Sequence, residues 1–171
     1  MALSLYDVSI PGYVLMLKNL AVLLEKAEAH AKAGGADPQT FLDKRLAPDM
    51  ATLTGQIQLA SDAAKGGAAR LAQVEPPSFP DVETTWPELK DRLTRTIAFI
   101  ETIRPEQVDG GEDRTIEMKF PNMTMTFTGR DFLLGFSLPN FLFHVTTAYG
   151  LLRSQGVPLG KMDYLAGGQA G

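Results

Sequence analysis

Apolar residues recur every three to four positions along four long stretches of the chain, which is the spacing of one helix face. These stretches predict helices over residues 11–45, 48–73, 85–104 and 130–155, and we expect the first two to be broken. Short connections join neighbouring stretches. Four amphipathic helices of this length, joined in this way, predict an all-α four-helix bundle around one core.

The helix ends carry recognisable signals. We expect the second helix to begin at Pro48, because proline suits the first position of a helix. Thr85 and Glu88 have the spacing of a capping box for the third helix. Gly66-Gly67 weakens the second helix without stopping it, since glycine has low helix propensity.

The segment before the fourth helix changes to a period of two, which is typical of half-buried strands. Pro121-Asn122 supplies a turn in its middle. The pattern predicts a small β-hairpin between the third and fourth helices. We expect its apolar face to pack on the bundle as core rather than to bind a ligand. That face comprises Ile116, Met118, Phe120, Met123, Met125 and Phe127.

The fourth stretch is strongly apolar but contains a group of polar residues, here called the polar notch: Asn140, His144 and Thr147. They share one stripe, because positions i, i+4 and i+7 stack on one helix face. Pro139 removes a helical hydrogen bond, so a kink and a free carbonyl should lie beside them. His144 is the candidate catalytic residue. The alternative is a core histidine whose hydrogen bonds are simply satisfied.

Length and charge narrow the function classes. The 171 residues predict a single domain over 1–166, followed by a disordered glycine-rich tail over 167–171. A net charge of −4 argues against a nucleic-acid partner, which requires a basic surface. The chain has no cysteine, so thiol chemistry is excluded. It shows neither a signal peptide nor a membrane-spanning run, which predicts a cytoplasmic protein without a membrane partner.

Four segments resemble a known family: LAPDM at 46–50, QIQLASDAAK at 56–65, LPNFLFHVTTAYGLLRSQGVPLGK at 138–161, and the following Asp163. In these segments the chain resembles the DinB/YfiT-like superfamily of four-helix bundles. Within it, the chain is similar to a bacterial family known only as a domain of unknown function. The resemblance implies an all-α bundle with a small β-hairpin between helices three and four.

Characterised superfamily members are similar to metal-dependent, thiol-linked transferases and isomerases. Their divalent metal is held by one histidine of the second helix and an HxxxH pair of the fourth. The resemblance places His144 on the second histidine of that pair and Asn140 on the first. The remaining ligand position falls near Gln58, or at Thr54 in a shifted register. Amide oxygens are poor ligands for such metals, so we predict no cofactor, although the superfamily would allow a divalent metal. An inward-facing Asp62 could restore a histidine–carboxylate site.

Two functions remain open, and whether the protein is an enzyme is not decided. The first is a small-molecule pocket in which His144 acts as a base oriented by Asn140. The residues expected around it are Thr147, Tyr149, Gln56, Gln58 and Asp62. The alternative is a non-catalytic binding or dimeric assembly protein with a structural notch. A fourth helix that is apolar nearly all round favours a homodimer.

Overall fold

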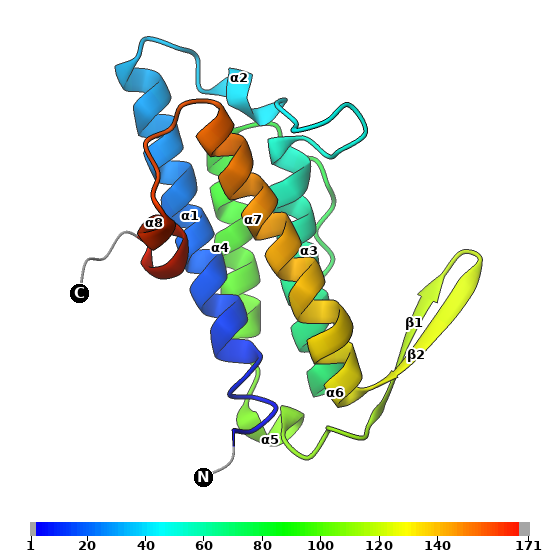
Figure 1. Ribbon diagram of the computed structural model, residues 1–171. Helices are drawn as coiled ribbons and strands as arrows, with labels where there is room; N and C mark the ends of the chain where they lie inside the picture. Colours follow the sequence, from blue (N-terminus) through cyan, green and yellow to red (C-terminus); the bar gives the residue numbers. More distant parts are fainter. Residues whose placement is uncertain (1–2, 168–171) are drawn as a thin grey trace.

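The computed structural model describes residues 3–167 and is a bundle of four long helices with a projecting β-hairpin (Figure 1). The bundle helices are α1 (Ile10–Ala33), α3 (Leu53–Ala72), α4 (Trp86–Ile100) and α7 (Leu138–Ser154). Short helices are α2 (Gln39–Leu42), α5 (Pro105–Val108), α6 (Gly129–Asp131) and α8 (Lys161–Ala166). The predicted all-α bundle is confirmed. The predicted tail lies, apart from Gly167, outside the described residues.

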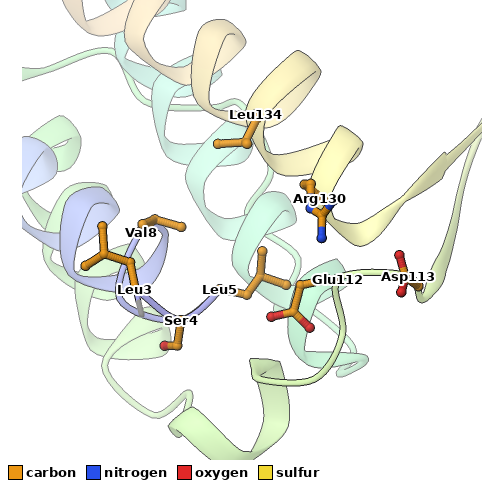
Figure 2. A pocket seen from close by; sticks show the side chains of 8 residues that line it. All are labelled: Leu3, Ser4, Leu5, Val8, Glu112, Asp113, Arg130 and Leu134. Carbon is orange, nitrogen blue, oxygen red and sulfur yellow. The ribbon is translucent and has the colours of Figure 1, made fainter. Parts of the chain in front are cut away.

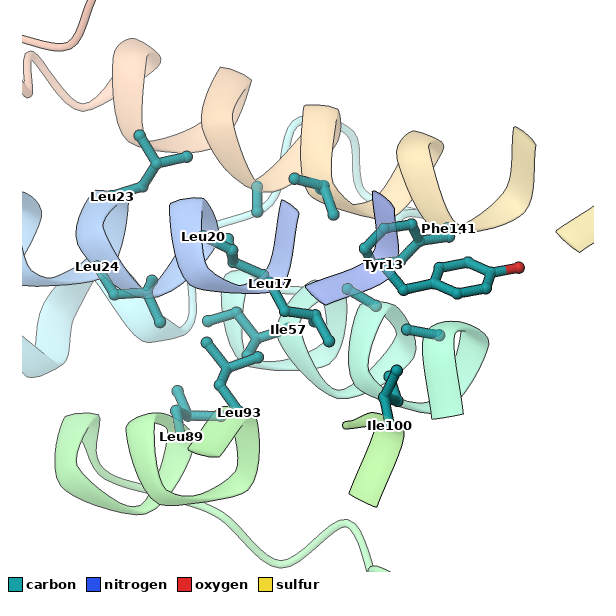
Figure 3. Packing of buried hydrophobic residues seen from close by; sticks show 14 of the residues in the cluster. Tyr13, Leu17, Leu20, Leu23, Leu24, Ile57, Leu89, Leu93, Ile100 and Phe141 are labelled. Atoms are coloured by element: carbon teal, nitrogen blue, oxygen red, sulfur yellow. The ribbon is translucent and has the colours of Figure 1, made fainter. Parts of the chain in front are cut away.

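The core lies between the inward faces of the four long helices, and Figure 3 shows part of it. Burial of each such side chain stabilises the fold by about 1.5–3 kcal/mol, so the predicted stripes hold the bundle together. In the described part of the chain, no helix is both long and apolar enough to cross a membrane. Fully buried core residues include Leu17, Leu20, Leu24, Ile57, Leu93 and Phe141.

The helix boundaries agree with the sequence in part. The capping box is present, because Glu88 N donates to Thr85 Oγ1 at 3.4 Å and Thr85 N donates to Glu88 Oε2 at 2.9 Å. The prediction that the second helix begins at Pro48 is wrong. Helix α3 begins at Leu53, after Thr52, whose hydroxyl accepts a hydrogen bond from Gly55 N at 3.2 Å. The Thr52 hydroxyl can accept a hydrogen bond from a backbone amide of the first helical turn, which a proline side chain cannot do. The helix therefore begins directly after Thr52.

The kink expected at Pro139 takes the form of a π-helical turn. This segment, Phe132–Ser137, follows α6 and runs directly into α7. Single π-helical turns inside helices are uncommon and occur frequently at functional sites. The residues around Ser137 and Asn140 are therefore candidates for a functional site.

The hairpin pairs β1 (Thr115–Phe120) with β2 (Met123–Thr128) in antiparallel register, and Pro121-Asn122 forms the predicted turn. Its apolar face packs on the core only in part, through Ile116, Met118 and Phe127. Ile116 is buried, but Phe120 is 41% and Met123 55% exposed. The strands leave the bundle at their base and stand away from the helices, so the outer residues do not reach the core (Figure 1).

At the base of the hairpin, the segments before β1 and after β2 are in close contact, and this base is called pinched below. Gly129 is buried, and a Cβ at this position would collide with the carbonyl oxygen of Gly111. Arg130 N donates to the carbonyl oxygen of Glu112 at 2.9 Å. The two strands therefore enter and leave the bundle side by side.

Candidate functional site

A groove with a volume of about 430 Å³ lies between α3, the π-helical turn, α7 and the hairpin. Its polar lining residues are Asp62, Arg70, Ser137, Asn140 and His144. Its apolar lining includes Met118, Phe120, Phe132 and Phe136. The groove thus contains two members of the polar notch, beside a concave apolar surface of the kind that binds small molecules.

The ring of His144 is held in one orientation by Gln56. Nδ1 lies 2.8 Å from Gln56 Oε1, while the Gln56 amide nitrogen donates to the carbonyl oxygen of Ala51 at 3.4 Å. Because this oxygen only accepts, Nδ1 carries the proton and Nε2 keeps its lone pair. Burial lowers the pKa of His144 below its ordinary value of 6.5, so the ring is neutral at pH 7. A neutral imidazole of this tautomer presents an acceptor at Nε2.

Asn140 lies one turn before His144 on α7 and lines the same groove, as their spacing predicts. The expectation that Asn140 orients the ring is wrong, since that contact belongs to Gln56. Thr147, the third member of the polar notch, does not line the groove. It is buried, and its hydroxyl donates to the carbonyl oxygen of Phe143 at 2.7 Å. Its polar atom is therefore satisfied within its own helix.

Gln58 was expected at the second-helix ligand position, but it faces away from His144. Its amide nitrogen donates to Glu83 Oε2 at 3.0 Å. Two residues along a helix rotate the side chain by about 200°, so Gln56 and Gln58 point to opposite sides. Thr54, the alternative position, donates to the carbonyl oxygen of Leu42 at 3.2 Å. The register inferred from the resemblance is thus corrected by two residues.

Tyr149 was also expected near His144, and the structure places it elsewhere. Its ring packs edge-on against Tyr164 of α8, with centroids 5.9 Å apart. The two tyrosines line a separate shallow pocket with Lys161. Tyr149 is five residues from His144, which turns it to another side of α7.

Asp62 lines the groove, but its carboxylate is engaged by cations. Oδ1 lies 2.9 Å from Arg92 Nη2 and 3.0 Å from Lys65 Nζ. The Arg92 side chain is fully buried and also contacts Asp81 at 2.9 Å and Glu83 at 3.0 Å. This cluster of Arg92 with three carboxylates joins α3 and α4 to the proline-rich connection between them. Asp62 is therefore committed to a structural role.

The donor set of the groove does not fit a tight divalent metal site. Within residues 3–167, no three histidine, cysteine, aspartate or glutamate side chains lie close enough together to hold one. Gln56 Oε1 is occupied by His144, and Asp62 by two cations. Catalytic zinc sites normally use three protein ligands of histidine, cysteine or carboxylate type.

The sequence reasoning missed two polar groove residues, Ser137 and Arg70. Ser137 shares a buried hydrogen bond of 2.7 Å with the hydroxyl of Tyr13, and burial raises the pKa of that tyrosine. Arg70 belongs to α3 and lines the groove together with Ser137. Gln56 was expected around His144, but not as the residue that holds its ring. A stripe of Gln56, Ala60, Ala63 and Gly67 at helical spacing would have indicated the face of α3 that meets α7.

A second depression of about 480 Å³ lies where the described chain begins, and Figure 2 shows its lining. Its charged residues are Glu112, Asp113 and Arg130, and it contains none of the residues that the sequence singled out. The groove, which combines a histidine, an amide and a hydroxyl, is therefore the stronger candidate.

Comparison with known proteins identifies the family. No curated protein matches the chain. The crystal structure of a DinB family member protein from Shewanella denitrificans is similar, with 40% sequence identity and a TM-score of 0.87. The similarity covers 94% of this chain and 91% of that one. A family described as a domain of unknown function, DUF1993, matches residues 5–165. The chain therefore belongs to the DUF1993 family and has the bundle of a DinB family member.

Proposed function

We propose that the groove binds a small molecule and presents Nε2 of His144 to it. One observation carries this proposal: Gln56 fixes the ring at Nδ1, and Nε2 makes no hydrogen bond within the described residues. A histidine that only stabilised the core would have both nitrogens satisfied or fully enclosed. Instead, this ring is half-buried and lines a groove.

The chemistry of such a site follows from its groups. The lone pair of Nε2 accepts a hydrogen bond from a hydroxyl, amide or thiol of the ligand, and it can also take that proton. The Asn140 amide offers both a donor and an acceptor one helical turn away. The aromatic wall of Phe132 and Phe136 keeps part of the ligand out of water. The site therefore has the means for general-base chemistry at neutral pH.

Imidazole signals in NMR spectra test the proposal directly, because the chain has two histidines, His144 and His30. We expect members of a library of polar aromatic fragments to shift the His144 signal and to leave His30 unchanged. Gln56→Ala should lower the affinity for these fragments by about tenfold, the loss typical of one buried hydrogen bond. Gln58→Ala is the matched control and should leave binding unchanged.

The alternative function is assembly, in which the polar notch is structural and the fourth helix binds a second copy. Two large apolar side chains favour it, since Leu134 is 56% and Phe143 is 55% exposed. The same NMR experiment separates the two functions. A His144 signal that no fragment shifts, or fragments that shift both histidines equally, would contradict the pocket and leave assembly as the better account.

We expect the protein to bind no tight divalent metal. Asn140 and Gln56 would offer amide oxygens, which hold zinc or nickel poorly, and His144 alone offers a strong nitrogen. Elemental analysis of protein purified without a chelator or an affinity tag should find less than stoichiometric metal. A stoichiometric metal that is lost in His144→Ala would contradict this expectation.

A further inference from the structure

Arg70 brings a positive charge to the groove. Its side chain is exposed, and Nη1 donates to the carbonyl oxygen of Gly66 at 2.9 Å. Within residues 3–167, no carboxylate lies within ion-pair distance of its guanidinium. Asp62, the other charged lining residue, is already neutralised by Arg92 and Lys65. The groove therefore contains a positive charge that the described protein leaves available.

The position of this charge depends on a glycine. A Cβ on Gly66 would lie 2.6 Å from Arg70 Nη1, so the guanidinium lies across the helix where a side chain is missing. Helical side chains lean toward the N-terminus of their helix, which here brings the charge back along α3 toward His144. The neighbouring Gly67 lies against the hydroxyl groups of Ser137 and Tyr13. The guanidinium and the Ser137 hydroxyl thus belong to the same end of the groove.

The spacing of the polar groups suggests the shape of a ligand. Seven residues separate Ser137 from His144, both of which line the groove, and this corresponds to about 10 Å along the helix. Apolar side chains from Phe132, Phe136 and the hairpin line the groove as well. A guanidinium binds carboxylate, sulfonate or phosphate oxygens through a planar pair of donors.

We propose that this end of the groove is an oxyanion subsite, and that the ligand is an elongated apolar molecule with one anionic group. The anionic group binds Arg70 and the Ser137 hydroxyl, while the far end meets Nε2 of His144. This inference rests on the proposed function, because it specifies the ligand class of the same groove.

Two fluorescent dyes of similar shape test it. 8-Anilinonaphthalene-1-sulfonate carries a sulfonate on an apolar aromatic body, and N-phenyl-1-naphthylamine is its uncharged counterpart. Affinities are measured by fluorescence for the wild type, Arg70→Gln and Arg45→Gln, and the His144 imidazole signal locates each dye. Arg45 is a matched control, because it is exposed and donates to a backbone carbonyl, that of Pro48, at 3.3 Å. It does not line the groove.

Arg70→Gln should lower the affinity for the sulfonate dye by about tenfold, the loss expected for one charge-assisted contact. The affinity for the uncharged dye should stay the same. Arg45→Gln should change neither affinity. If both dyes shift His144 and Arg70→Gln affects them equally, the oxyanion subsite is refuted while the pocket stands. If neither dye shifts His144, both the subsite and the proposed function are contradicted.

Discussion

Arg92→Ala should lower the free energy of unfolding by about 3–5 kcal/mol, the effect of removing one partner from a buried ion pair. The Arg92 side chain is fully buried, and its loss leaves Glu83 without its main cation. The Arg92 Nε–H also donates to Ser61 Oγ at 3.2 Å, so a buried hydroxyl loses one of its two partners and keeps Thr96 Oγ1 at 2.7 Å. Urea unfolding measures the change.

Arg104→Ala is the control for this variant. Arg104 pairs with Glu106 at 2.6 Å outside the cluster. However, the Arg104 side chain is 67% exposed, so the expected loss is under about 1 kcal/mol. Equal losses for the two variants would refute the structural role of the cluster.

The cluster also makes stability depend on pH. Burial tends to raise the pKa of Glu83, but hydrogen bonds from Gln58, its own backbone and Arg92 hold it below the ordinary value of 4.5. Because the folded pKa is the lower one, this stabilisation is complete above pH 4.5 and is lost as the pH falls through the folded pKa. When the pH is lowered, the free energy of unfolding of Arg92→Ala should therefore fall by less than that of the wild type.

Gly67→Ala and Gly66→Ala should change stability in opposite directions. A Cβ on Gly67 would collide with Ser137 Oγ and lie 2.7 Å from the buried Tyr13 hydroxyl. Forcing a methyl group into this packed contact should destabilise the protein by about 1–3 kcal/mol. A Cβ on Gly66 meets only the end of the flexible Arg70 side chain. The better helix propensity of alanine should then stabilise this variant by about 0.5–1 kcal/mol.

Thermal and urea unfolding of the two variants provide the measurement. Each glycine is the control for the other, since both lie inside α3 and differ by one position. Losses of similar size in both variants would show that the close approach of Ser137 and Tyr13 to α3 has no energetic consequence.

The helices could be predicted from the sequence because their apolar periodicity reports one buried face, whatever that face meets. The start of α3 could not, because Pro48 and Thr52 both carry start signals and only the capping contact to Gly55 decides between them. The hairpin shows a further limit. Alternation separates its two faces, but it does not tell whether Phe120 reaches the helices or stands away from them.

The candidate site was predicted more accurately on α7 than on α3. His144 and Asn140 share a face of α7, and their spacing alone brings them to the same groove. The partner from α3 depends on how that helix is rotated against α7, which local spacing does not specify. An error of two residues exchanged Gln56 for Gln58, whose amide contacts Glu83 on another side of the helix.

The pinched base of the hairpin has an evolutionary consequence. Because Gly111 and Gly129 hold the two strands together where they leave the bundle, the tip can gain or lose residues without moving any helix. Lengthening such a closed loop is entropically inexpensive, since each doubling costs about 0.6 kcal/mol. The strands nevertheless contribute Met118 and Phe120 to the groove. Insertions and deletions at the tip would therefore alter the lining of the groove while the bundle stays the same.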